Sequence, residues 1–108
     1  MTAKEYLKEI KKIDTQIRNK NAELKLLHGA EMATVKAQID ELREKQRQII
    51  KTIEQLPEAE YDVLHRVYIQ GETLYEAAAG RNIGYSSITH IHGNALKRLN
   101  KIIHKKQE

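Results

Sequence analysis

Apolar residues recur at alternating steps of three and four through the first half of the chain. The first series is Ala3, Tyr6, Ile10, Ile13, Ile17, Leu24 and Leu27, and the second is Met32, Val35, Ile39, Leu42, Ile49, Ile53 and Leu56. This is the seam spacing of a coiled coil. The break around Gly29 predicts two helices of about 25 residues, or about 37 Å each, with Gly29 ending the first in a left-handed conformation. Helices joined by so short a break are antiparallel neighbours, so residues 1–56 are expected to form a helical hairpin arm.

A two-helix arm buries only one stripe on each helix, so its seam is expected to find a further partner. We expect a homodimer through the arm; the alternative is a monomeric hairpin folded against its own chain. The seam residues assigned to this association are Ile10, Ile13, Ile17, Leu24, Val35, Ile39, Leu42 and Ile49. Lys20 and Gln46 also occupy seam positions, where they either fix the register or are tolerated at a partly exposed seam.

The second half of the chain reads as three further helices. Pro57 closes the arm, because the residue before a proline is pushed out of the helical region, and it suits the first position of a helix that Gly71 ends. Thr73 and Glu76 form a capping-box pattern at the start of a short helix. Asn82 lies where the chain must turn, and asparagine tolerates the left-handed conformation.

The last helix is expected from about residue 85 to residue 105. Its apolar stripe holds Ile88, Ile91, Ala95, Leu99 and Ile102, and its opposite face holds Ser86, Thr89, His90, Gly93 and Lys97. Small polar groups followed by cations suit the reading of base edges and the holding of phosphates. Gly93 either lets the backbone approach DNA or is a neutral surface glycine. Residues 57–108 therefore predict a helix-turn-helix DNA-binding domain, and the whole chain an all-α fold.

One set of residues between positions 56 and 99 matches a known pattern. The set is Leu56, Pro57, Glu58, Val63, Leu64, Tyr68, Thr73, Leu74, Glu76, Ala78, Ile88, Ile91, Ala95, Leu96 and Leu99. With it, this stretch resembles the region 4 helix-turn-helix of bacterial sigma-70 type transcription initiation factors. The layout of a helical arm followed by this module also resembles small phage-encoded regulators of late transcription of the ArpU/RinA type.

The resemblance implies specific DNA contacts. Base contacts fall on Tyr85, Ser86, Thr89 and His90, and backbone contacts on Ser87, Lys97 and Arg98; Arg81 and Lys101 are added as further backbone contacts. The run Tyr-Ser-Ser-Ile-Thr-His replaces the usual polar-charged run, so a different sequence preference is expected. Gly84 stands where Ser or Thr usually caps the helix. Arg81 replaces a usually buried Leu, so either the short helix ends early or Arg81 reaches toward phosphate.

The charge is unevenly distributed. The net charge is only +4, but residues 80–107 contain six Lys or Arg and no acid, whereas residues 57–79 contain five acids and one Arg. This split fits a basic face that meets phosphates; the alternative is a solvated C-terminal helix. The chain has no Cys and no apolar run of the ~20 residues that span a bilayer. We expect a soluble cytoplasmic protein, in a bacterial host cell if it is phage-encoded, with no membrane partner.

Catalytic and metal-binding chemistry are not expected. His90 and His92 are two residues apart, so a helix points them in different directions and they cannot hold one ion. His92 falls beside the apolar stripe and is expected to be packed or to lie at an interface. The sequence offers no Gly-rich phosphate loop and no convincing nucleophile–base pair. We therefore expect no enzyme activity, no metal and no cofactor.

Three functions remain open on the sequence. The leading hypothesis is a sequence-specific transcription regulator that binds double-stranded DNA at promoters and contacts RNA polymerase. The second is an oligomeric DNA-recognising assembly protein, such as the small subunit of a phage terminase. The third is a coiled-coil adaptor that captures another protein through the arm.

Overall fold

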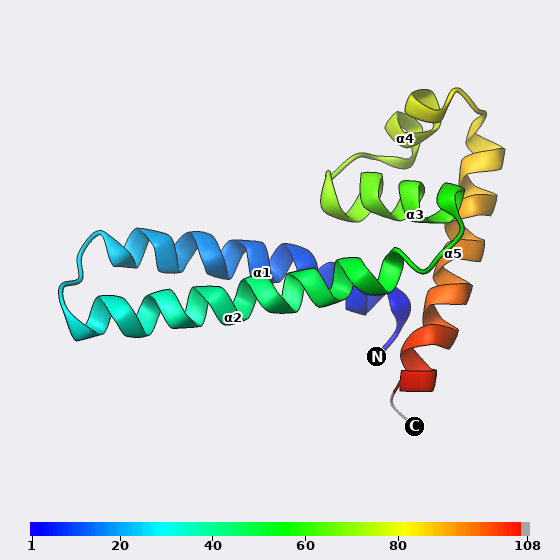
Figure 1. Cartoon of the computed structure of the whole chain (residues 1–108). Helices are drawn as coiled ribbons and strands as arrows, with labels where there is room; N and C mark the ends of the chain where they lie inside the picture. The colour runs from blue at the N-terminus through cyan, green and yellow to red at the C-terminus, as the bar shows by residue number, and fades with distance from the viewer. Residues whose placement is uncertain (107–108) are drawn as a thin grey trace.

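The computed structural model describes residues 1–106 and confirms the all-α prediction. The final residues of the predicted C-terminal domain, 107–108, lie outside the described part. In chain order the elements are α1 (Ala3–Leu24), α2 (Ala30–Ile53), α3 (Glu58–Leu64), the π-helical turn η1 (His65–Ile69), α4 (Leu74–Arg81) and α5 (Tyr85–Lys106). Helices α1 and α2 lie side by side as a long hairpin, and α5 stands across one end of it with α3 and α4 beside its first half (Figure 1). We call this end of the hairpin its root and residues 25–29 its tip.

The two hairpin helices begin and end slightly off the predicted positions. Thr2 caps α1 by accepting a hydrogen bond from the Glu5 N–H at 3.1 Å. Helix α1 then ends at Leu24 rather than Leu27. Gly29 has the expected positive φ of 63°, but it precedes α2 rather than ending α1, so its predicted role was wrong. The reason is that tightened i→i+3 hydrogen bonds close α1 without it, and the chain needs the positive φ only where it enters α2.

The predicted seam is buried between α1 and α2 of the same chain. Six of its residues form one buried cluster: Ile10, Ile13, Ile17, Val35, Ile39 and Ile49. Leu24 and Leu42 are partly buried against it. Of the two polar seam residues, Lys20 Nζ donates to Gln38 Oε1 at 2.8 Å and Gln46 Nε2 donates to the Ile10 carbonyl at 3.4 Å. Both polar seam residues therefore bond across the hairpin, and the seam is covered within one copy of the chain.

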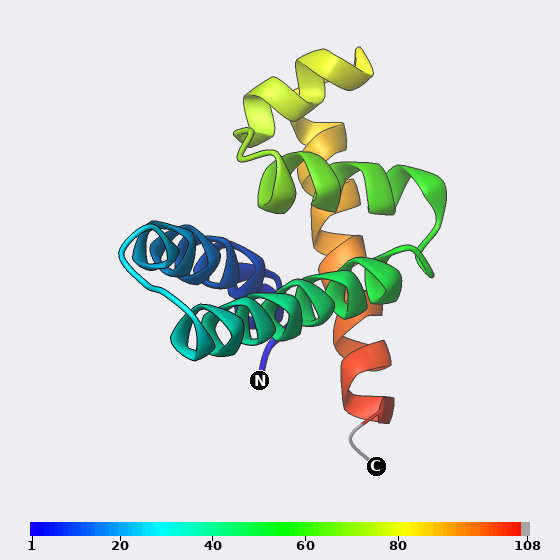
Figure 2. The ribbon, with the colours of Figure 1, turned by 60° about the vertical axis from the view of Figure 1, so that its left-hand side comes forward.

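A second buried cluster joins the root of the hairpin to the rest of the molecule. It consists of Ala3, Leu7, Ile53, Leu56, Leu64, Ala95, Leu99 and Ile103. The member from the last turns of α5 is Ile103, while Ile102, which the sequence pattern placed on this stripe, is only partly buried. Figure 2 shows α5 crossing the root. One hydrophobic cluster thus includes residues on both sides of Pro57, from the hairpin, α3 and α5.

The helix after Pro57 differs from a regular α-helix. Pro57 has a ψ of 151° and precedes the helix instead of forming its first residue, because α3 begins at Glu58. The last turn widens into η1, where the Gln70 N–H donates to the His65 carbonyl at 3.0 Å. Gly71 then leaves the helix with a φ of 76°. None of the helices among residues 1–106 is long and apolar enough to cross a membrane.

Candidate nucleic-acid interface

The turn between α4 and α5 is built from local signals that the sequence identified. The Thr73 and Glu76 capping box is confirmed, with both side chain–backbone hydrogen bonds at 3.1 Å. Asn82 ends α4 in the left-handed conformation at φ 58° and ψ 44°, as predicted. The Ile88 N–H then donates to the Gly84 carbonyl at 3.1 Å, so Gly84 lies directly before α5, which begins at Tyr85. The chain therefore reverses sharply between the two helices.

A small core holds α4 against α5. It consists of Val63, Ala77, Ala78 and Ile88, with Val67, Leu74, Ile83 and Ile91 partly buried around it. Ala77 and Ala78 lie on the inner face of α4, as expected, and both are buried in this core. Because Ile88 packs inward, the residues on the other side of α5 face solvent.

An exposed stripe follows the outer side of α5. Its four exposed residues are Ser86, His90, Lys97 and Lys101, and partly buried Gly93 and Asn94 lie between them. A Cβ added to Gly93 would meet no atom within 4 Å, so the fold itself does not require a glycine there. The stripe begins with small polar groups and ends with cations, which is the arrangement that the sequence predicted.

The hydroxyl of Thr89 is already engaged. Its Oγ1 donates to the Ser86 carbonyl at 2.8 Å, and the side chain is only partly exposed. His90, by contrast, is exposed, with its Nε2 3.2 Å from Asn94 Nδ2. Asn94 therefore steadies the ring of His90, a role that the sequence reasoning missed although the i, i+4 spacing would have indicated it.

An aromatic stack marks the start of this interface. The rings of Tyr75 on α4 and Tyr85 on α5 lie 4.3 Å apart between centroids and 16° from parallel. Both remain exposed, Tyr75 at 69% and Tyr85 at 45%. The sequence reasoning identified Tyr85 but missed Tyr75, because only the folded chain brings the two helix starts together. Exposed aromatic faces supply stacking and apolar contact area to a partner.

The predicted backbone contacts fall into two groups. Ser87, Lys97 and Lys101 are exposed. Two arginines are instead paired with acids: Arg81 Nη1 lies 2.8 Å from Asp62 Oδ2 and 3.4 Å from Glu58, and Arg98 Nε donates to Glu60 Oε2 at 3.0 Å. A phosphate contact by either arginine would have to replace an existing ion pair. The basic charge available to DNA is therefore smaller than the sequence count indicates.

Two of the acidic partners of these arginines are removed from solvent: Asp62 is partly buried and Glu60 is buried, whereas Glu58 is exposed. Burial acts to raise the pKa of Asp62, but hydrogen bonds from Arg81 and Arg66 and their positive charges outweigh it and lower the pKa. Glu60 is buried, and within residues 1–106 its Oε1 has no hydrogen-bond partner. The hydrogen bond from Arg98 to Oε2 thus offsets part of the cost of burying the carboxylate of Glu60.

His92 is partly buried, as its position beside the apolar stripe predicted. Its Nε2 lies 3.0 Å from the Tyr68 hydroxyl, and the two rings stack at 5.8 Å. Burial lowers the pKa of His92, and the nearby Lys4 lowers it further. Burial also raises the pKa of Tyr68. Lys4 belongs to α1, so this site is part of the contact between the hairpin and α5.

In the part of the chain that is described, no three His, Asp or Glu side chains lie together in a way that could hold a metal ion. Comparison of the chain with protein-family models, with curated proteins and with solved structures finds no match.

Proposed function

We propose that this chain is a sequence-specific DNA-binding transcription regulator of the phage-encoded kind, acting at promoters with RNA polymerase. The observation that carries the proposal is the exposed stripe of α5, which follows a tight left-handed turn and is held outward by the buried Ile88. A single α-helix fits the major groove, where side chains reach base edges. The sequence resemblance to sigma-70 region 4 suggests the promoter and the polymerase.

In this interface His90 and Tyr85 read bases, while Lys97 and Lys101 hold phosphates. Tyr75 supports Tyr85 from α4 and adds apolar surface next to it. Ser86 supplies a short donor and acceptor at the start of the helix, where thymine methyl groups and base edges are within reach of small side chains.

The proposal is tested by selecting bound sites from random duplex DNA at near-physiological salt. An enriched motif supports base reading. His90→Ala and Tyr85→Ala should each weaken the free energy of binding to that motif by about 1–3 kcal/mol, and should have little effect on binding to random DNA. Lys97→Ala should weaken binding to the selected motif and to random DNA alike. It should also reduce the slope of log affinity against log salt concentration by about one.

Lys36→Ala is the matched control for Lys97→Ala, because it removes the same charge from an exposed position on α2. It should leave DNA binding unchanged. Equal losses on selected and random DNA for His90→Ala and Tyr85→Ala would contradict base reading. Equal losses for Lys36→Ala and Lys97→Ala would show that binding follows net charge rather than the stripe.

A further inference from the structure

A groove lies in the corner between the hairpin and η1. It has a volume of about 600 Å³ and is lined by residues of α1, α2 and η1. We call it the corner groove. Its apolar lining consists of two buried residues, Leu7 and Ile10, and three partly buried ones, Ile50, Val67 and Ile69. The corner groove therefore presents apolar surface that the fold covers only in part.

Two features of this lining are not explained by the core. Ile50 lies outside the three buried clusters of residues 1–106 and is not among the residues packed against them, yet its side chain lines the corner groove. Another wall of the groove is formed by residues 67–71, at the end of η1 and directly after it. Turns of π-helix are rare and are often found at functional sites. An apolar partner would cover Ile50 and pack against this wall.

The rim of the corner groove on α1 carries positive charge. Lys8, Lys11, Asp14 and Arg18 line the groove, and all four are exposed. Arg18 Nη2 lies 3.2 Å from Asp14 Oδ2, so these two charges largely cancel. The ion pairs of α1 within residues 1–106 are this pair and Lys12–Glu9, so Lys8 and Lys11 have no acidic partner there. The two free lysines favour an anionic partner.

The dimensions of the groove suit a helix. From Leu7 to Arg18, α1 rises by about 17 Å, so a helix lying along α1 would meet the groove over about three turns. An amphipathic helix places its apolar stripe in such a groove and keeps its charged residues at the edges. Lys8 and Lys11 are about one turn apart on α1, which matches two carboxylates one turn apart on the incoming helix.

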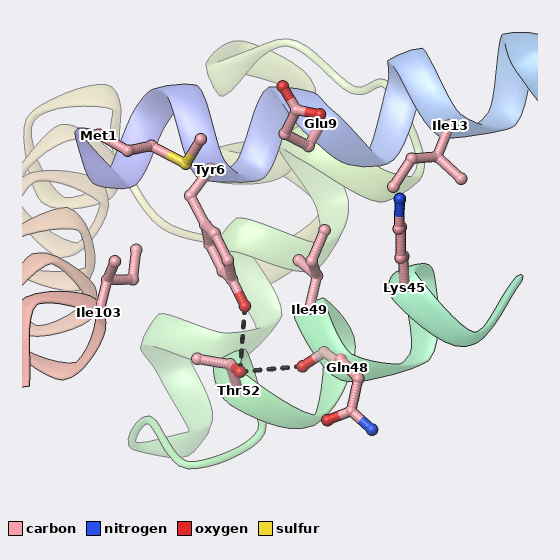
Figure 3. Close-up of a pocket in the computed structure, with 9 residues that line it drawn as sticks. All are labelled: Met1, Tyr6, Glu9, Ile13, Lys45, Gln48, Ile49, Thr52 and Ile103. Carbon is pink, nitrogen blue, oxygen red and sulfur yellow. Dashed lines mark hydrogen bonds between the residues drawn. The ribbon is translucent and has the colours of Figure 1, made fainter. Parts of the chain in front are cut away.

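The groove at the root of the hairpin shows no such selectivity. It has a volume of about 430 Å³, and its lining includes Glu9 and Lys45, one charge of each sign (Figure 3). The Tyr6 hydroxyl in this groove donates to Thr52 Oγ1 at 3.1 Å (Figure 3). Charge at the root therefore favours neither an acidic nor a basic partner.

We propose that the corner groove binds an acidic amphipathic helix of another protein. The apolar stripe of that helix covers Ile50, Val67 and Ile69, and two of its carboxylates pair with Lys8 and Lys11. A small anion would meet the lysines but leave the apolar lining uncovered, whereas an apolar helix without acids would leave the lysines unpaired. The two features together select the acidic amphipathic helix. This contact does not depend on DNA binding by α5, so it is tested without DNA.

Three fluorescent peptides of about 15 residues, each designed as a helix, test the contact by fluorescence anisotropy at near-physiological salt. The first has leucine every three or four residues and glutamate on both sides of the leucine stripe. The second has lysine in place of each glutamate, and the third has serine in place of each leucine. The wild-type chain should bind the glutamate peptide with a dissociation constant of about 100 μM or lower, and at least about tenfold more tightly than the other two peptides.

A reversal of charge on the chain locates the contact. Lys8→Glu/Lys11→Glu should weaken binding of the glutamate peptide at least about tenfold and should bind the lysine peptide more tightly than the wild type does. Lys25→Glu/Lys45→Glu is the matched control, because it makes the same change in net charge at two exposed lysines that do not line the corner groove. Screening by salt should keep its effect on the affinity for the glutamate peptide below about threefold.

Ile50→Ser tests the apolar lining. Because Ile50 lies outside the buried clusters, circular dichroism should show unchanged helix content. Binding of the glutamate peptide should weaken at least about fivefold, because the contact with the leucine stripe is lost.

Several results would overturn the proposal. One is equal affinity of the wild type for the glutamate and lysine peptides, and another is no binding of the glutamate peptide up to about 1 mM. A Lys8→Glu/Lys11→Glu variant that keeps the wild-type preference would overturn it, as would an equal loss in the Lys25→Glu/Lys45→Glu control. A serine peptide that binds as well as the glutamate peptide, or an Ile50→Ser variant that binds like the wild type, would exclude the apolar contact and overturn it as well.

Discussion

Replacing Arg81 by alanine separates a structural role of this side chain from a DNA contact. Arg81 and Asp62 are 22% and 28% exposed, and their 2.8 Å contact joins α4 to α3. A hydrogen bond to a charged group contributes about 1.5–3 kcal/mol, and the remaining exposure of both groups reduces this to about 1–2 kcal/mol. Glu58 is 79% exposed and adds little. Asp62 keeps its bond from Arg66, so no buried charge is stranded.

The expected result is a melting temperature lower by roughly 5–10 °C, measured at neutral pH by far-UV circular dichroism. The loss should depend on pH because the pKa of Asp62 is lowered in the folded chain. A carboxylate with a lowered pKa stabilises the fold above its unfolded pKa of about 3.9, and this contribution is lost as the pH falls through the folded value. The difference in melting temperature between wild type and Arg81→Ala should therefore be largest at neutral pH and should shrink below about pH 4.

Arg47→Ala is the control for this measurement. Arg47 and Glu44 are closer, at 2.7 Å, but they are 64% and 53% exposed on α2. We expect no measurable change in melting temperature, because exposed ion pairs contribute little. Equal melting temperatures for wild type and Arg81→Ala at neutral pH would refute the reasoning. An unchanged stability with a large loss of DNA affinity would instead assign Arg81 to phosphate.

Three further substitutions test other positions in the fold. His92 should make the wild type less stable as the pH falls from about 7.5 to about 5.5, because burial lowers its folded pKa and the unfolded chain binds the proton first. Urea unfolding of His92→Phe should show a smaller fall, and equal falls would contradict this. Gly93→Ala should raise the free energy of unfolding, measured with urea, by about 0.5–1 kcal/mol, because nothing lies near the added methyl group. Gly80→Ala should raise the free energy of unfolding by less, because its methyl group would meet the Arg66 guanidinium. An equal increase for the two variants would show that the Arg66 side chain moves aside freely.

Local signals in the sequence predicted the local structure well. The Thr73–Glu76 capping box depends only on two residues three positions apart. The left-handed conformation of Asn82 depends only on the tolerance of asparagine for it. Both could therefore be predicted without tertiary structure. The seam residues of α1 and α2 were likewise found from their spacing. What the spacing could not decide was whether these stripes pair within one chain, because periodicity names the buried face and not its partner.

The features that sequence reasoning missed depend on contacts between distant residues. Arg98 lies 38 positions from Glu60, and nothing near either residue indicates that they form a pair. The stack of Tyr75 on Tyr85 exists only because the turn at Asn82 brings the starts of two helices together. The wide turn η1 has no residue pattern that distinguishes it from the α-helix before it.

The direction of the α5 stripe determines which part of the molecule stays uncovered when the stripe meets DNA. On α5, Ala95, Leu99 and Ile103 pack against the root of the hairpin, so the opposite side points away from the hairpin. A duplex lying on the stripe would then leave the hairpin uncovered, from its root to its tip. The hairpin would project away from the DNA, where a second protein could contact it while the stripe is occupied.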